Sequence, residues 1–127
     1  MHSHNIHIHK HIYIFTYIPI LFQGQRYNSK TDIWSLGVIL YEMVCLKMPF
    51  NGNNMRQLVQ AIVNTTPSPP STTYSTSLRE LVKDILLKDP KRRPGINNIL
   101  NRQIVKDRIT IGRRINSFVL SNTRPFM

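Results

Sequence analysis

The sequence predicts a mostly α-helical fold, for three reasons. Apolar residues recur at helical spacing along the chain after residue 23. Clusters of Pro, Gly, Ser and Asn interrupt this spacing where helices would end. Outside the first 23 residues no segment has the signal of a β-strand. The 127 residues have the length of one domain, and their 41% hydrophobic content can supply a core.

The first predicted helix spans about residues 32–46 and is apolar on almost every side. Such a helix is expected to be buried at the centre of a domain. It begins with Asp32, whose carboxylate suits the positive end of the helix dipole but needs partners if it is buried. Ser29 or Thr31 can cap this end. The turn-forming residues of segment 47–53 end the helix.

A second helix is predicted at about residues 54–63, and its apolar side chains share one face: Met55, Leu58, Val59 and Ile62. Segment 65–76 is rich in Pro, Ser and Thr, which predicts an irregular connection. A disordered linker is the alternative. The hydrophobic helices on both sides favour a short strap instead.

A third helix is predicted to begin with a capping box, in which Ser77 caps the helix and Glu80 reaches back. It ends near Pro90, and a short fourth helix follows at about residues 96–102. From Thr110 the apolar pattern fades. We therefore expect residues 110–127 to form a polar, basic tail that frays.

The formal net charge of +11 raises the possibility of a nucleic acid or an anionic membrane as partner. The basic residues are scattered, however, and no aromatic residues interleave with them as a stacking surface for bases would require. The sequence therefore predicts neither a specific nucleic acid nor a membrane as partner. The single cysteine, Cys45, excludes an intrachain disulfide, fits a reducing compartment and is interpreted as a small core residue.

Residues 1–23 differ in composition from the rest of the chain. Their apolar run, residues 12–22, is shorter than the ~20 residues that span a bilayer. A secretory signal and a metal site formed by His7, His9 and His11 are alternatives, but the cleavage site and the further ligands are missing.

Codon composition offers a third explanation of this segment. Leu21-Phe22-Gln23 can be encoded by a pyrimidine tract followed by CAG, as at the end of an intron. Our hypothesis is that residues 1–23 are a translated intron forming an irregular leader, and that the coding sequence proper starts near Gly24.

Four groups of residues together resemble the C-terminal lobe of a eukaryotic serine/threonine protein kinase: Asp32-Ile33-Trp34-Ser35-Leu36-Gly37, Leu40-Tyr41-Glu42, Pro49-Phe50 and Leu86-x-x-Asp89-Pro90-x-x-Arg93-Pro94. The stretches Tyr27-Asn28-Ser29-Lys30 and Tyr74-Ser75 resemble the NIMA-related (NEK) kinases in particular. The resemblance covers residues 24–109. It implies a partial protein-kinase C-lobe, with a central buried helix plus three following helices and no N-lobe sheet.

The resemblance also implies structural roles for residues of the central helix. Asp32 would accept hydrogen bonds from the backbone of the catalytic loop. Ile39 and Met43 would lie beneath the column of apolar side chains that ends at the adenine ring. Trp34 and Gly37 would allow close packing under the activation segment.

Two further residues have implied roles in charge pairing. Glu42 would face a basic residue of the peptide substrate. Arg93 would form a buried ion pair with the glutamate of an Ala-Pro-Glu motif, but Ile20 stands where that glutamate would be. We therefore expect Arg93 to be a cation without a partner. We also expect an exposed apolar surface on the central helix and poor solubility of the isolated chain.

Kinases of this family transfer the γ-phosphate of ATP with the help of Mg2+. This sequence contains no Gly-rich loop, ATP-binding lysine, His-Arg-Asp or Asp-Phe-Gly motif. The chain alone is therefore expected to bind neither ATP nor Mg2+, to have no catalytic residues and to be inactive. The alternative is a non-catalytic helical binding module, similar to a pseudokinase. Whether the chain is a kinase fragment or such a binding module, the resemblance implies that protein substrates or regulators dock on the Met55–Val63 helix region. It also implies a cytoplasmic, cytoskeleton-associated location.

Overall fold

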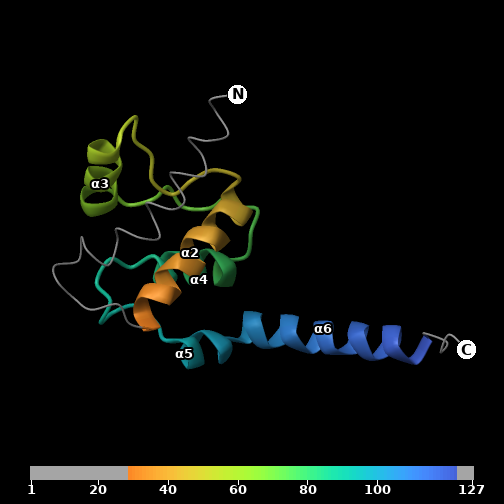
Figure 1. Cartoon of the computed structure of the whole chain (residues 1–127). Coiled ribbons are helices and arrows are strands. Elements are labelled where there is room, and N and C mark those ends of the chain that lie inside the picture. The colour runs from red at the N-terminus through yellow and green to blue at the C-terminus, as the bar shows by residue number, and fades with distance from the viewer. Residues whose placement is uncertain (1–28, 123–127) are drawn as a thin grey trace, which may run out of the picture. The chain divides into compact units, whose positions relative to one another are not determined.

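The computed structural model describes residues 29–122, which contain helices and no strand. The helices are α2 (Ser29–Cys45), α3 (Met55–Asn64), α4 (Thr76–Ile85), α5 (Ile96–Leu100) and α6 (Gln103–Asn122) (Figure 1). This confirms the predicted mostly α-helical class. The leader, residues 1–23, lies outside the described residues. The chain divides after Gly95 into two compact units.

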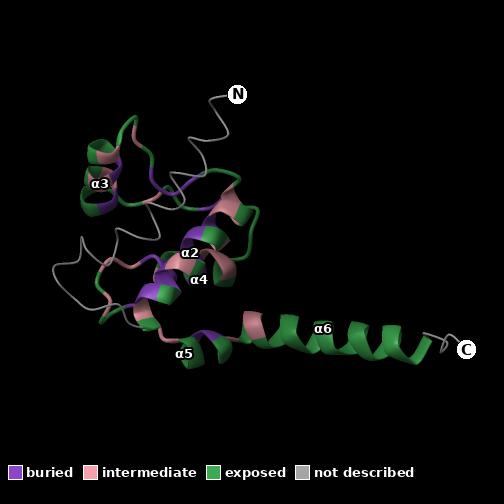
Figure 2. Ribbon diagram, in the orientation of Figure 1, coloured by how far each residue is buried: buried purple, intermediate pink, exposed green. Residues whose placement is uncertain are grey.

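The core of the first unit forms between one face of α2 and the segments that follow it. Trp34, Val38 and Tyr41 of α2 pack in one cluster with Met48, Phe50, Leu58, Ile62, Val82 and Leu86. The rings of Trp34 and Phe50 stack with 5.9 Å between their centroids and 9° between their planes. Burial of these large apolar side chains is the main driving force for assembling α2, α3 and α4. The buried residues of α2 form a band along one side of the helix in Figure 2.

Gly37 lets α2 approach α4 closely. A Cβ atom at this position would lie 2.3 Å from Cγ2 of Ile85, closer than atoms can pack, and 3.0 Å from Cδ2 of Leu86, which is a tight contact. Glycine, which has no side chain, therefore fits between the two helices without a clash.

The caps of α3 and α4 explain where these helices begin. The side chain of Asn54 accepts a hydrogen bond from the backbone of Gln57 at 2.9 Å, close to the predicted start of α3. The side chain of Ser75 accepts one from the backbone of Leu78 at 3.2 Å. The predicted capping box at Ser77 is therefore wrong. The helix begins two residues earlier, which takes Glu80 out of the position from which it could reach the cap.

The Pro-rich connection between α3 and α4 is an ordered strap, as predicted. The buried hydroxyl group of Tyr41 donates a hydrogen bond to the carbonyl oxygen of Ser68 at 2.8 Å, and Pro70 is buried. Just before the strap, the ammonium group of Lys88 donates to the carbonyl oxygen of Val63, near the C-terminal end of α3, at 3.0 Å. These long-range contacts fix a segment that has no regular structure of its own.

In the second unit, α5 packs against the beginning of α6, and Ile99 is buried. From Thr110 to Asn122 the expected fraying is absent, because α6 continues without a break to Asn122; residues 123–127 of the predicted tail lie outside the described residues. The Thr110 hydroxyl group donates to the carbonyl oxygen of Lys106 at 3.0 Å, so this polar side chain stays within the helical pattern. None of the residues of α6 is buried.

Candidate functional site

Helix α2 has two opposite faces, which divide the residues singled out in the sequence. Positions 32, 36, 39 and 43 repeat every three or four residues and therefore share one side of the helix. Asp32, Leu36, Ile39 and Met43 are all exposed, with Met43 the most open at 70%. We call these four residues the open face of α2. The opposite face carries Trp34, Gly37 and Tyr41 and is buried.

The open face corrects the expectation that α2 is buried all round. The described residues bury only one side of the helix, which begins at Ser29, and Asp32 in its first turn is an exposed rather than a buried carboxylate. Ile39 and Met43 are large apolar side chains in contact with solvent, which costs free energy unless something covers them. The expected exposed apolar surface on this helix is thus present.

The buried face positions Trp34 and Gly37 against the core rather than toward the open side. Trp34 is fully buried on Phe50, and Gly37 lies against Ile85 of α4 and Leu86 just after it. Glu42 lies between the two faces and is half-buried. The structure therefore brings Asp32, Ile39 and Met43 together and separates them from Trp34 and Gly37.

Arg93 is held inside the first unit by backbone carbonyl groups. Its side chain is 3% exposed, and its guanidinium group donates to the carbonyl oxygens of Lys30 at 2.6 Å, Leu87 at 2.9 Å and Lys88 at 3.1 Å. The group also lies 4.9 Å from the centre of the Trp34 ring, within the range of a cation–π interaction. The expectation that Arg93 is a cation without a partner is therefore wrong.

Burial lowers the pKa of Arg93 to about 10, and the carboxylate of Asp89 opposes this shift. The guanidinium group is still charged at neutral pH and can serve as a fixed donor. Lys30 donates in return to the carbonyl oxygen of Arg93. These reciprocal bonds connect the first turn of α2 to the segment after α4, so Arg93 orients α2 in the fold.

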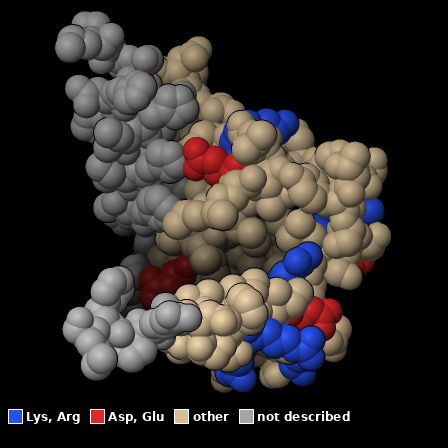
Figure 3. Space-filling view, turned by 90° about the vertical axis from the view of Figure 1, so that its right-hand side faces the viewer, with Lys and Arg blue, Asp and Glu red and all other residues tan. Residues whose placement is uncertain are grey.

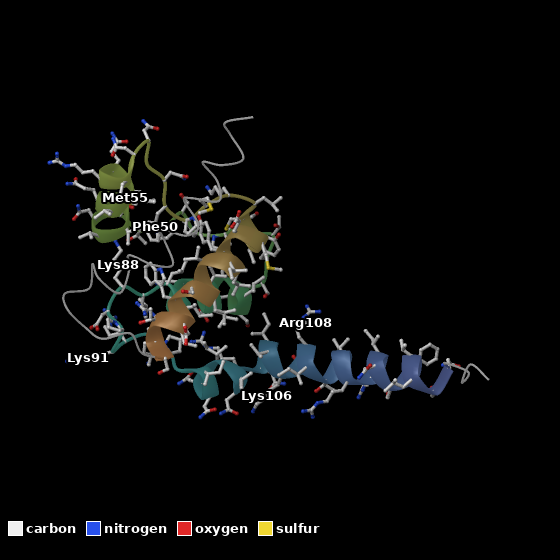
Figure 4. The ribbon with its side chains drawn as sticks, viewed as in Figure 1. Phe50, Met55, Lys88, Lys91, Lys106 and Arg108 are labelled. Atoms are coloured by element: carbon white, nitrogen blue, oxygen red, sulfur yellow. The ribbon has the colours of Figure 1, made fainter. Side chains whose placement is uncertain are left out.

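Lys88 and Tyr41 also tie elements together, although the sequence did not single them out as site residues. Lys88 reaches toward α3 in Figure 4 and lies 5.9 Å from the centre of the Phe50 ring. Burial lowers the pKa of Lys88. Burial and the neighbouring thiol of Cys45 raise the pKa of Tyr41 to about 12. A buried hydroxyl or ammonium group needs partners, but sequence alone does not show which distant carbonyl supplies them.

Within residues 29–122 no three His, Cys, Asp or Glu side chains come together as metal ligands. Most of the described surface drawn in Figure 3 is neither acidic nor basic. In the same part of the chain, no helix is both long and apolar enough to cross a bilayer. The candidate site is therefore helix α2, which has one packed face and one open face. Arg93 binds the first turn of this helix through the carbonyl oxygen of Lys30.

Comparison with known proteins identifies the class to which this arrangement belongs. The family model of the protein kinase domain matches residues 12–105, which is most of the chain and includes part of the leader. The chain therefore belongs to the protein kinase family.

The relatives narrow this to the NEK type. The chain is 44% identical over 91 residues to the serine/threonine-protein kinase Nek5 of Homo sapiens, covering 72% of this chain and 13% of that protein. It is 43% identical over 86 residues to the serine/threonine-protein kinase Nek8 of Danio rerio, covering 68% of this chain and 12% of that protein. It is also 42% identical over 94 residues to the probable serine/threonine-protein kinase nek3 of Dictyostelium discoideum, covering 73% of this chain and 8% of that protein. The chain is thus a fragment of a NEK-like serine/threonine kinase domain, and it spans about an eighth or less of these relatives.

Proposed function

We propose that this chain supplies the central part of the C-terminal lobe in a NEK-type serine/threonine kinase. In that setting the open face of α2 contacts the rest of the lobe, and Asp32 accepts hydrogen bonds from the catalytic-loop backbone. The complete kinase would transfer the γ-phosphate of ATP to Ser or Thr of a protein. The 127 residues alone would carry out no transfer.

The observation that carries this proposal is the division of α2 into two faces. The packed face carries Trp34 and Gly37 in close contact with the core, and Arg93 bonds to the first turn of the helix. On the open face, an acid and three apolar side chains share one line and have solvent around them. Apolar side chains in a row next to one carboxylate fit a surface that is buried against another part of a larger domain.

Inactivity of the isolated chain is tested by an assay of transfer from radiolabelled ATP. Phosphoryl transfer needs fixed donors and metal ions around the phosphates, and the described residues provide no such set. The purified chain, incubated with Mg2+ and a general Ser/Thr protein substrate, should incorporate no label above background. Incorporation that EDTA abolishes and that follows the chain through purification would refute this part of the proposal.

A second candidate function is protein docking on α3, either in the complete kinase or in a non-catalytic module. The outer side of α3 is open to solvent, with Arg56, Gln60 and Val63 exposed. Met55 lies at its first turn, where it is half-buried (Figure 4). Leu58, in contrast, is 3% exposed and belongs to the core, so it cannot contact a partner.

A binding test on α3 must therefore use its outer residues. Arg56→Ala and Gln60→Ala remove exposed contacts and should leave stability within about 0.5 kcal/mol, the usual range for surface changes. If α3 docks a protein, the doubly substituted chain should lose partners that the unchanged chain retains in a pull-down. Equal retention by both chains would exclude this surface. We propose no nucleic acid and no membrane as a partner of the kinase-like region.

We also propose a cytoplasmic location for the complete kinase, with association to the cytoskeleton. This rests on the family and on the single thiol of Cys45, which suits a reducing compartment. Imaging of the tagged full-length protein tests it, and exclusive staining of a secretory compartment would contradict it.

A further inference from the structure

Helix α6 carries a line of apolar side chains of which only the first, Ile104, is half-buried. Ile104, Ile111, Ile115 and Phe118 are separated by seven, four and three residues, so they lie on one side of the helix. Ile111, Ile115 and Phe118 are exposed, with Phe118 at 70%. We call these four residues the α6 stripe. Anchors at i, i+4 and i+7 are the spacing by which a helix binds a groove in another protein.

Apolar side chains also occur away from the stripe. Ile109 and Leu120 fall on the far side of α6 from Ile104 and Ile111, and both are exposed. A flat surface, such as a membrane or one neighbouring helix, could cover the stripe but would leave these two side chains in water. The distribution therefore fits a partner that surrounds the helix.

The charges of α6 indicate the character of that partner. The helix contains Lys106, Arg108, Arg113 and Arg114 but only one acid, Asp107. Lys106 and Arg108 project from different sides of the helix in Figure 4, so basic groups are available around it. A groove with acidic residues at its rim would pair with these groups while apolar residues inside it received the stripe.

The same charges argue against a second copy of this chain as the occupant. Paired helices are held in register by opposite charges beside the apolar seam. After Asp107 the helix contains no acid, so two α6 helices would place basic side chains near basic side chains in either orientation. This repulsion would oppose pairing.

We propose that α6 is a docking helix for an acidic protein with a wrapping apolar groove, of the kind that calcium opens in EF-hand sensors. Calcium-loaded sensors of this type expose a Met-rich groove that accepts basic amphipathic helices. This interaction does not depend on the proposed phosphotransferase role, although the first residues of α6 fall within the stretch that matches the kinase domain. It gives the chain a calcium-dependent partner.

Calorimetric titration of the full 127-residue chain with calmodulin, used as the probe, tests the proposal. Binding should occur with calcium and disappear when EGTA removes the calcium, because only the loaded form has an open groove. The double variant Ile115→Ala and Phe118→Ala should bind at least about tenfold more weakly, since each truncation removes buried apolar area. Alanine preserves the helix, which circular dichroism can verify.

A matched control uses the polar side of the same helix. Thr110→Ala and Ser117→Ala make the same number of alanine substitutions at exposed positions outside the stripe. This control should bind within about twofold of the unchanged chain. Arg113→Gln with Arg114→Gln should weaken binding and reduce its dependence on salt, because two of the charges that attract the acidic rim are lost.

Three results would overturn the proposal. The first is an absence of calcium-dependent binding to calmodulin by the unchanged chain. The second is equal weakening by the stripe variant and the polar control. The third is binding through α6 to vesicles of phosphatidylserine, or self-association through α6, in a chain that calmodulin does not bind. A membrane or a second copy would then be the occupant.

Discussion

Substitution of Gly37 by alanine tests the close approach of α2 and α4. The new methyl group would lie 2.3 Å from Cγ2 of Ile85, whereas ordinary contacts begin at 3.4 Å, so the two groups must separate by roughly 1 Å. Such overpacking costs about 1–3 kcal/mol. Alanine favours the helix by about 1 kcal/mol over glycine. Because Leu86 also lies close, we expect the overpacking cost to fall in the upper part of its range. After the gain in helix propensity is subtracted, the net loss of stability should be about 1–2 kcal/mol.

Urea unfolding followed by the fluorescence of Trp34, the only tryptophan, measures this change at low protein concentration. The midpoint should fall by about 0.5–1 M for a typical dependence on urea. In the background of Ile85→Leu, which removes the clashing Cγ2 atom, Gly37→Ala should cost less. The same substitution at Gly112, where a Cβ would meet no atom within 4 Å, should instead increase helix content. An unchanged or higher midpoint for Gly37→Ala would refute the close packing.

Three further changes test individual contacts. Arg93→Ala leaves three buried carbonyl oxygens without their donor, so it should lower the free energy of unfolding in urea by about 3 kcal/mol or more. The control Arg92→Ala changes an exposed neighbour and should lower it by less than about 0.5 kcal/mol. Similar losses for the two variants would contradict the buried role of Arg93. The raised pKa of Tyr41, about 12 against an ordinary 10, favours its neutral form in the fold, so its stabilising contribution is complete below pH 10 and is lost as pH rises through 12. Tyr41→Phe should lower the free energy of unfolding by about 1 kcal/mol at neutral pH, because the hydrogen bond to Ser68 is lost. This difference between the variant and the unchanged chain should shrink between pH 10 and 12. A difference that stays constant would contradict the raised pKa of Tyr41. Leu46 follows α2 in the left-handed region, with a φ of 56°, and its side chain is 89% exposed. Glycine adopts this conformation without strain, so Leu46→Gly should raise the free energy of unfolding by about 1 kcal/mol. A loss of stability would contradict this backbone conformation.

The sequence predicted the elements whose signals are local. The apolar spacing of Leu58 and Ile62 indicated α3, and the turn residues before and after it set its ends within a residue or two. The Pro-rich strap was predicted because hydrophobic helices on both sides had to stay close. The kinase family was evident from the spacing of Asp32, Trp34 and Gly37, which is specific even in a fragment.

Other features depend on contacts that no local pattern contains. Which side of α2 is open follows from what packs against it, so the exposure of Asp32 and Met43 could not be inferred from a helix that is apolar all round. The carbonyl groups around Arg93 come from segments up to 63 residues away. Helix α6 was missed because its apolar residues spread around the helix, and a weak periodicity resembles a loop.

The most direct test of the two-faced α2 uses methionines already in the chain. Met43 on the open face is 70% exposed, whereas Met48 in the core cluster is 6% exposed. Oxidation of methionine converts an apolar side chain into a polar one, and access to solvent favours it. After brief treatment of the folded chain with hydrogen peroxide, peptide mass spectrometry should find Met43 oxidised well before Met48. Equal rates, or faster oxidation of Met48, would contradict the arrangement on which the account of this kinase fragment rests.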